Sequence, residues 1–293
     1  METSKAKSIL TTTKNKDLKI AIQGYSGAFH DLAAQYFYQT NHLQVSPADT
    51  FEELVEQVEN KKVDAGIMAI ENTLAGSLLN NYKLLYHSKL QVVGEVYLRI
   101  RQNLMVWPGV KIEDLKEVHS HPVAIDQCKR FFKQYPHIRL IKMEDTALSA
   151  KQIRENKLLD RGGIASSRAA EIYGLEIIGK SIETNKKNFT RFLILNREED
   201  VQEKPFNKVS IRFTVKHEVG SLHIVLASLA INQANLTKIQ SVPIVGKNWE
   251  YAIFLDFILK DSSRFDVTIR SLKQFADDLK VLGKYQKGEH HEG

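Results

Sequence analysis

Residues 188–195 read Asn-Phe-Thr-Arg-Phe-Leu-Ile-Leu, and the pattern of the chain changes just after this stretch. Its second half is the apolar run of a buried strand, whereas its first half puts a hydroxyl, Thr190, next to a fixed cation, Arg191. Neighbouring side chains of a strand point to opposite faces. We therefore expect Thr190 and Arg191 to diverge, one toward a cleft and the other toward the wall behind it. An edge strand with one exposed arginine is the alternative that the pentapeptide alone leaves open.

Strands alternate with helices from residue 19 to residue 196. Strands are expected at 19–23, 63–70, 90–107, 118–120, 139–142 and 163–165. Helices are expected at 28–39, 50–59, 78–87, 121–134, 146–155 and 167–173. This alternation predicts a layered α/β fold with a largely parallel sheet.

A second pattern follows a charged segment, 197–205, which we expect to be a linker. Strands are expected at 208–216, 236–245, 249–259 and 281–285, and helices at 220–233 and 265–279. The order βαββαβ in one short segment is the ferredoxin-like arrangement. Residues 1–18, rich in Lys, Ser and Thr, are expected to be a disordered leader, with a targeting segment as the alternative. The polar tail 286–293 is expected to be frayed.

Composition limits the function classes. The 293 residues are 43% hydrophobic and 26% charged, which is enough for a sizeable core and about two domains. The net charge of +6 is spread along the chain, so no nucleic-acid surface is predicted, and attraction of a small anion explains the balance equally well. The single cysteine, Cys128, excludes an internal disulfide and fits the cytoplasm. No stretch approaches the roughly 18 apolar residues of a membrane helix.

Four polar turns carry the functional signal. They are 24–27, 71–73, 120–122 with 126–128, and 188–191. The first three follow a strand and precede a helix, where ligands gather in open α/β sheets. Helix N-termini at such places favour an anion. Most of the side chains offered are amides and hydroxyls, so the sequence predicts a hydrogen-bonding site for an anionic organic molecule.

Several of these residues have a plainer interpretation. The glycines at 24 and 27 lack the GxGxxG spacing, so they favour a tight turn over a nucleotide site. Glu71 is expected to be structural, because its carboxylate would repel an anion. His121 is expected to be a helix-entry residue, and Cys128 a buried apolar residue rather than a nucleophile. The histidines show no metal-ligand spacing, so we expect no metal and no other cofactor.

Together these stretches resemble the prephenate dehydratase family. The matching segments occur in the family's order, at 20–24, 69–77, 92–95, 120–128, 165–170 and 188–192. The resemblance implies a lyase that removes carbon dioxide and water from prephenate, giving phenylpyruvate for phenylalanine biosynthesis. Arogenate dehydratase is the alternative within this class. A non-catalytic sensor of a small anion is the alternative outside it, because a fold does not fix a function.

The resemblance also implies an architecture. The catalytic domain, 19–196, is expected to adopt the two-lobed fold of type II periplasmic binding proteins. One lobe would hold 19–98 plus 180–196, and the other 99–179. Residues 206–285 resemble the ACT regulatory domain, which implies allosteric control by L-phenylalanine. We expect a homodimer or homotetramer, because strand 249–259 has apolar side chains on both faces and one of these would otherwise be exposed.

The family's functional residues map onto specific positions of this chain. Thr190 matches the essential threonine, which we expect to donate a hydrogen bond to the leaving hydroxyl. Substrate binding is assigned to Ser26, Asn72, Thr73, Ser120, Gln127 and Arg191. For Arg191 two roles stay open, a partner of a substrate carboxylate or a brace behind the site.

Effector binding is assigned to the third part of the chain. The residues are Gly220, Ser221, Leu222, Asn235, Gln240 and Ser241. The family's Glu-Ser-Arg-Pro signature reads Gln-Ser-Val-Pro at 240–243. Valine cannot replace the five N–H donors of a guanidinium. We therefore expect a weakened response to phenylalanine.

Overall fold

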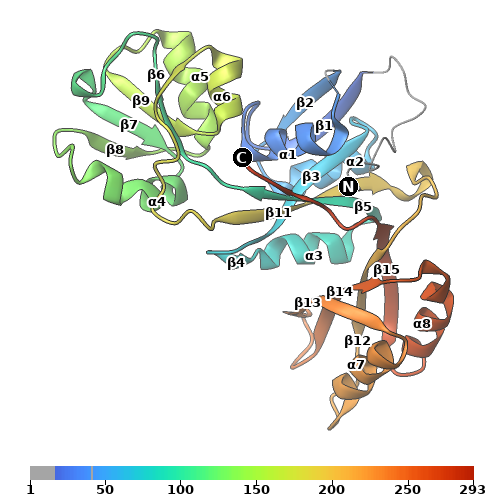
Figure 1. Ribbon diagram of the computed structural model, residues 1–293. Coiled ribbons are helices and arrows are strands. Elements are labelled where there is room, and N and C mark those ends of the chain that lie inside the picture. The colour runs from blue at the N-terminus through green and yellow to red at the C-terminus, as the bar shows by residue number, and fades with distance from the viewer. Residues whose placement is uncertain (1–16, 41) are drawn as a thin grey trace, which may run out of the picture.

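The computed structural model describes residues 17–40 and 42–293, so most of the predicted leader lies outside the described residues. Three sheets organise the fold, and each forms the centre of a separate body (Figure 1). Two α/β lobes lie next to one another, joined by two crossings of the chain. A smaller body, built from the last part of the chain, packs beneath the first lobe.

The first lobe contains a sheet in the order β16-β5-β11-β3-β1-β2, with β4 beside β3. Its strands are β1 (Leu18–Gln23), β2 (Leu43–Ala48), β3 (Ala65–Asn72), β4 (Gly76–Ser77), β5 (Leu90–Arg99), β11 (Phe189–Arg197) and β16 (His290–His291). Strand β11 runs antiparallel to both of its neighbours, β3 and β5. One face packs on α1 (Phe29–Tyr38), and the other on α2 (Phe51–Glu59) and α3 (Leu79–His87).

The second lobe contains a sheet in the order β10-β6-β9-β7-β8. Its strands are β6 (Asn103–Val106), β7 (Glu117–Ser120), β8 (Arg139–Lys142), β9 (Arg161–Ala165) and β10 (Glu176–Gly179). Its helices are η1 (Ile112–Asp114), α4 (Pro122–Phe132), α5 (Thr146–Asn156) and α6 (Ser167–Tyr173). Asp145 and Ser166 cap α5 and α6 by accepting backbone N–H groups, which fixes where these helices begin.

The third body has the predicted βαββαβ order and the ferredoxin-like strand order β13-β14-β12-β15. Its elements are β12 (Lys208–Thr214), α7 (Ser221–Ile231), β13 (Ala234–Pro243), β14 (Tyr251–Leu259), η3 (Ser262–Arg264), α8 (Phe265–Leu272) and β15 (Asp277–Tyr285). The predicted helix 265–279 is too long, because Asp277 and Lys280 already pair with β12. The segment before this body contains only the short helix η2 (Glu198–Asp200).

One apolar cluster extends across both lobes. Ile67 and Phe192 of the first lobe belong to the same cluster as Ala165 and Ala169 of the second. At the turn that follows β1, a Cβ on Gly27 would lie 2.7 Å from the Cα of Ala169, and the φ of Gly27 is +88°. Glycine is therefore required here by close approach of the other lobe and by backbone conformation, as expected for a tight turn.

The apolar patch predicted on strand 249–259 is not exposed, and this prediction is wrong. Ile253 and Phe257 belong to the core of the third body. On the other face of β14, Ala252 and Phe254 join the core of the first lobe, where the rings of Phe254 and Tyr82 are 5.0 Å apart. The same chain covers both faces, so this strand gives no reason for a second chain.

The tail predicted to be frayed is ordered instead. Strand β16 pairs in parallel with β5, and Gly288 donates its N–H to Glu95 (3.1 Å). The ring of His291 stacks on Tyr36 with centroids 4.3 Å apart. Glu292 pairs with Arg99 at 2.7 Å and also with Arg101. The C-terminus therefore lies beside the crossing between the lobes (Figure 1).

Candidate active site

Asn72 and Thr190 form the centre of the polar site. They are register partners at the ends of β3 and β11, and the Nδ2 of Asn72 donates to the Oγ1 of Thr190 at 2.9 Å. The Oδ1 of Asn72 accepts the N–H groups of Leu74 and Ala75, each at 2.9 Å, which fixes the amide orientation. Since the hydroxyl oxygen of Thr190 already accepts from Asn72, its proton is available to a further acceptor.

Asn188 lies next to this pair and was not among the predicted site residues. Its Oδ1 accepts from Asn72 at 2.7 Å, while its own Nδ2 is buried and has no hydrogen-bond partner among the residues that the structure describes. The side chain is 1% exposed. A buried donor without a partner carries a free-energy cost, and such groups call for an explanation. Its only signal in the sequence is its place in the polar half of the stretch 188–195.

Thr73 holds the two polar turns together. Its Oγ1 donates to the carbonyl of Lys187 at 3.0 Å and accepts from the N–H of Phe189 at 2.9 Å. The N–H of Thr73 in turn reaches the carbonyl of Phe189. The hydroxyl of Thr73 is therefore used to position the turn 71–73 against the turn 188–191.

Arg191 points away from this site, as the strand geometry predicted. It is 4% exposed, and its guanidinium contacts Glu95 at 2.7 Å and Asp256 at 2.6 Å. Its Nη2 also donates to the hydroxyl of Tyr285 at 3.2 Å. Of the two roles predicted for Arg191, the structure shows the brace. The assignment to substrate binding is wrong, because its donors are used on the face of β11 opposite Thr190.

The charges around Arg191 balance. Lys208 of the third body lies 2.8 Å from Glu95, so two cations meet two carboxylates in a buried cluster. Burial by itself lowers the pKa of Arg191, but Asp256, Tyr285 and Glu95 together raise that pKa well above its usual value. Burial and the nearby Arg191 lower the pKa of Lys208. Buried ion pairs of this kind persist only when every charge keeps its partner.

Ser120, Gln127 and Ser26 take different positions. The Oγ of Ser120 is fully buried and donates to the carbonyl of Ile164 at 2.6 Å. The Oε1 of Gln127 accepts from Gln102 at 3.3 Å. The carbonyl of Ser26 accepts from the hydroxyl of Tyr173 in the second lobe at 3.0 Å. Within the described residues, no hydrogen bond joins these three to Asn72 or Thr190.

Two residues with alternative chemical interpretations have structural roles. Cys128 is buried, and burial raises the pKa of its thiol to about 12, which suits the predicted apolar role. The Nδ1 of His121 accepts the N–H of Val123 at 3.3 Å, as expected of a helix-entry residue. Across residues 17–40 and 42–293, no three or more His, Cys, Asp or Glu side chains gather as a metal site would require.

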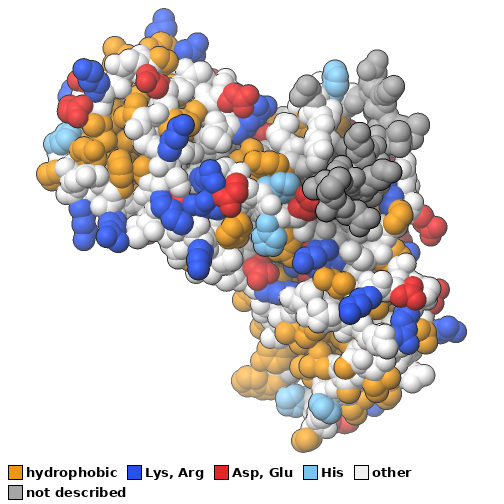
Figure 2. Space-filling model, viewed as in Figure 1, with side chains coloured by type: hydrophobic (Ala, Val, Ile, Leu, Met, Phe, Trp, Pro, Cys, Tyr) orange, Lys and Arg blue, Asp and Glu red, His pale blue; other side chains and the backbone are white. Residues whose placement is uncertain are grey.

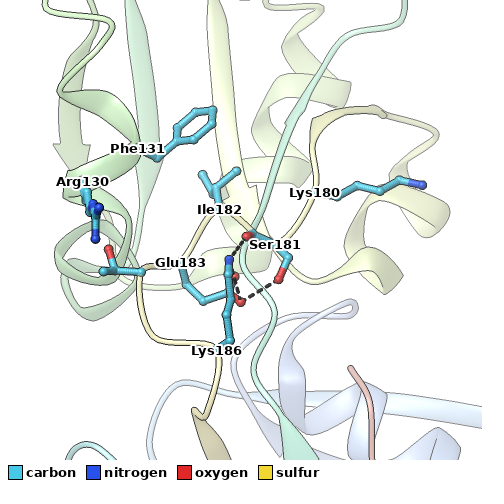
Figure 3. Close-up of a pocket in the computed structure, with 8 residues that line it drawn as sticks. Arg130, Phe131, Lys180, Ser181, Ile182, Glu183 and Lys186 are labelled. Carbon is cyan, nitrogen blue, oxygen red and sulfur yellow. Dashed lines mark hydrogen bonds and ion pairs between the residues drawn. The ribbon is translucent and has the colours of Figure 1, made fainter.

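A hollow of about 370 Å³ lies between α4 and the segment that returns from the second lobe (Figure 3). Arg130, Lys180 and Lys186 surround it. Glu183, at its edge, accepts from the hydroxyl of Ser181 at 2.7 Å and lies 3.5 Å from Lys186. The residues around Thr190 do not line this hollow, so it is separate from the Asn72–Thr190 pair.

The predicted effector residues do not form one cluster in a single chain. Gly220 precedes the first residue of α7 with a φ of +87°, whereas Asn235 follows the opposite end of this 11-residue helix, about 16 Å away along its axis. Gln240 donates to the carbonyl of Ser241. Val242, where the family signature has arginine, is 3% exposed and packs into the core shared with the first lobe.

Comparison with known sequences identifies the class of protein. The sequence pattern of the family described as "Prephenate dehydratase" matches residues 20–200. Arogenate dehydratase 2 of Petunia hybrida is 38% identical over 290 residues, covering 93% of this chain and 73% of that protein. Arogenate dehydratase/prephenate dehydratase 2 of Arabidopsis thaliana is 38% identical over 282 residues, covering 92% and 72%.

Solved structures share the fold. GqqA, described as a novel type of quorum quenching acylase, superposes with a TM-score of 0.81 at 28% identity, covering 92% of this chain and 98% of that one. The prephenate dehydratase of Arthrobacter aurescens, solved with L-Phe, gives 0.80 at 22% identity, covering 92% and 90%. The fold and the likeness define a lyase, built on two α/β lobes, that catalyses dehydration and decarboxylation. The chain belongs to the prephenate dehydratase family, which acts in aromatic amino acid biosynthesis.

On the face drawn in Figure 2, hydrophobic side chains gather on the second lobe and on the smaller body. In the view of Figure 2, Lys and Arg side chains alternate with Asp and Glu over both lobes and the smaller body. None of the helices formed by the described residues is long and apolar enough to cross a lipid bilayer.

Proposed function

We propose that this chain converts prephenate to phenylpyruvate, with Thr190 as the hydrogen-bond donor to the leaving oxygen. The bond between the ring and its carboxylate breaks and releases carbon dioxide. The electron pair makes the ring aromatic, the ring carbon–oxygen bond breaks, and hydroxide leaves. Aromatisation drives the reaction, so the task of the protein is to hold the dianion and stabilise the departing oxygen.

The single observation that carries this proposal is the hydrogen bond from Asn72 to the hydroxyl oxygen of Thr190, at 2.9 Å. It leaves the proton of Thr190 for the leaving oxygen. The pKa of an alcohol is too high for full proton transfer at neutral pH, so the hydrogen bond strengthens only as negative charge builds on that oxygen. A donor placed in this way contributes about 3–4 kcal/mol to the transition state.

Asn188 supplies a second donor in this proposal. Its Nδ2 is buried near Asn72, and no acceptor within residues 17–40 and 42–293 pairs with it. A substrate carboxylate or hydroxyl oxygen accepting from it would satisfy that group. Asn188 is therefore our choice for the residue that orients the substrate beside Thr190.

The choice between prephenate and arogenate is the finer question. Arogenate has an ammonium group where prephenate has a keto group. Of the plant relatives, one is named for arogenate alone and another for both substrates. We propose prephenate as the principal substrate, since the polar side chains that meet at Thr190 are amides and hydroxyls rather than carboxylates.

The deciding experiment supplies prephenate and arogenate separately to the purified full chain, with a chelator present, and follows phenylpyruvate and phenylalanine. A long-chain N-acyl amide serves as a third substrate, because one structural neighbour is described as an acylase. We expect the highest kcat/KM with prephenate. Turnover of arogenate alone would reverse the substrate choice, and turnover of neither would favour a non-catalytic binder of small anions.

We further propose that the βαββαβ body is an ACT domain that binds L-phenylalanine and that the chain is a homodimer or homotetramer. A structural neighbour solved with L-Phe supports the effector. For assembly, support comes from the edge strand β13, where Leu236 and Ile239 are exposed, and from the exposed Ile231 at the end of α7. Unpaired edges with apolar side chains favour pairing between chains.

A further inference from the structure

Two residue pairs lie back to back where β3 meets β11. Thr190 is the register partner of Asn72, and Arg191 is the register partner of Glu71. Since consecutive strand residues face opposite sides, the pair Arg191–Glu71 forms the reverse face of the pair that makes the polar site. Any displacement of the reverse pair therefore moves Thr190 and Asn72 as well.

The βαββαβ body contacts both members of the reverse pair. Asp256 on β14 lies 2.6 Å from Arg191, and Lys238 on β13 lies 3.1 Å from Glu71. Lys238 also donates to the hydroxyl of Ser77, just beyond the turn that carries Asn72, at 2.8 Å. The βαββαβ body therefore supplies an opposite charge to each member of the reverse pair. The carboxylate of Asp256 neutralises Arg191, and the ammonium group of Lys238 neutralises Glu71.

The strand ladder is irregular at this position. The register between β3 and β11 shifts between Arg191 and Phe192, so that Ile70 has no partner in the ladder directly behind the polar site. Such bulges aim side chains next to active sites and locally weaken pairing. The contacts from the βαββαβ body act at this irregular point.

We infer that Asp256 and Lys238 are positioning residues for the dehydration, fixing Arg191 and Glu71 on one face so that Thr190 and Asn72 stay aligned on the other. This inference rests on the proposed role of Thr190. Both residues contact the reverse pair, on the side of the strands opposite Thr190. Without Asp256, the buried guanidinium of Arg191 keeps one carboxylate partner instead of two. We expect it to move toward another acceptor and to displace β11.

The test is a double-mutant cycle on the full chain. Asp256→Asn keeps the shape of the side chain and removes its charge, and Asp266→Asn, at an exposed position of α8, is the matched control. We expect Asp256→Asn to lower kcat at least tenfold with KM changed less than twofold, and the control to change neither by more than twofold. In the Thr190→Ala background, Asp256→Asn should lower kcat by less than twofold, because the group that it positions is gone.

Lys238→Met is a second variant for the case that Asp256→Asn does not fold, since Lys238 lies nearer the surface. We expect kcat to fall three- to tenfold, Lys238→Arg to restore it, and the loss to vanish in the Thr190→Ala background. The inference is overturned if the fold-loss in kcat of the double variant equals the product of the fold-losses of the two single variants. The proposed function fails separately, if Thr190→Ala alone turns over normally.

Discussion

The Nδ2 of Asn72 lies 2.9 Å from the Oγ1 of Thr190, and the amide cannot turn, because its Oδ1 is held by two backbone N–H groups. The hydroxyl of Thr190 is thus polarised on one side and has its proton free on the other. Low-dielectric surroundings strengthen such a chain of hydrogen bonds. This relationship makes Thr190 the first residue to test.

Replacing Thr190 with alanine should lower kcat at least about 100-fold, because one well-placed donor to a departing oxygen is worth about 3–4 kcal/mol. KM should change less than threefold, since the hydrogen bond matters mainly in the transition state. Steady-state kinetics with prephenate would measure both. Thr190→Ser, which keeps the hydroxyl, is the control and should retain most of the activity. Near-normal turnover by the alanine variant would remove Thr190 from the mechanism.

The variant Asn188→Asp tests whether the Nδ2 of Asn188 donates a hydrogen bond to the substrate. An aspartate keeps the oxygen that accepts from Asn72 but replaces the free Nδ2 with a carboxylate oxygen. We expect KM for prephenate to rise at least tenfold, because the new charge repels a substrate carboxylate. Asn185→Asp, on the exposed part of the same segment, adds the same charge and should change KM less than twofold. Equal effects of the two variants would mean that only the overall charge matters.

His30 makes stability depend on pH. Its Nε2 is buried and has no hydrogen-bond partner in the described part of the chain. Its ring lies 4.9 Å from that of Phe192, and burial lowers its pKa from 6.5 to about 4. The unfolded chain therefore binds a proton below about pH 6.5 that the folded chain accepts only near pH 4. The free energy of unfolding should fall by about 3 kcal/mol as the pH drops through this window.

Denaturant titrations between pH 7 and pH 4 would show this fall. His30→Leu should flatten the dependence over that range, while His87→Leu, at an exposed position, should leave it unchanged. An unchanged slope in His30→Leu would assign the acid sensitivity to other groups.

Local patterns explain what could be predicted from the sequence. The strand 139–142 and the helix starts at 146 and 167 follow from short-range rules, and they match the structure. Strand β2 escaped prediction because it is a polar edge strand containing Pro47, which suppresses the usual signal. The divergence of Thr190 and Arg191 followed from strand alternation alone.

Long-range contacts explain what could not be predicted. The ion pair of Arg191 with Asp256 joins residues from different bodies, and no local pattern marks it. The tail was expected to fray because it is polar, but Glu292 finds Arg99 and Arg101 on the first lobe. The unpaired Nδ2 of Asn188 becomes visible only when every neighbouring acceptor is placed.

Assembly is expected to use the edge of the βαββαβ sheet. Strand β13 lies at one edge of this sheet, with Leu236 and Ile239 exposed. Light scattering on the full chain should give at least a dimer, and Ile239→Lys should shift it toward monomer, because a charge at a pairing edge opposes association. Ser263→Lys, on the exposed helix η3 of the same body, should leave the mass unchanged. A monomer at all concentrations in the parent chain would contradict the proposed assembly.

Phenylalanine is expected to bind less tightly to this chain than to a variant that regains the glutamate of the family signature. Val242 offers no donor to a carboxylate and is turned into the core against the first lobe, while Gln240 has lost the negative charge of the family's glutamate. Calorimetry with L-phenylalanine should therefore show tighter binding to Gln240→Glu than to the parent chain, because a carboxylate attracts the ammonium group of the amino acid. Gln233→Glu, at an exposed site beyond the end of α7, adds the same charge and should leave the affinity unchanged. Tight binding and strong inhibition in the parent chain itself would show that the altered signature does not weaken control.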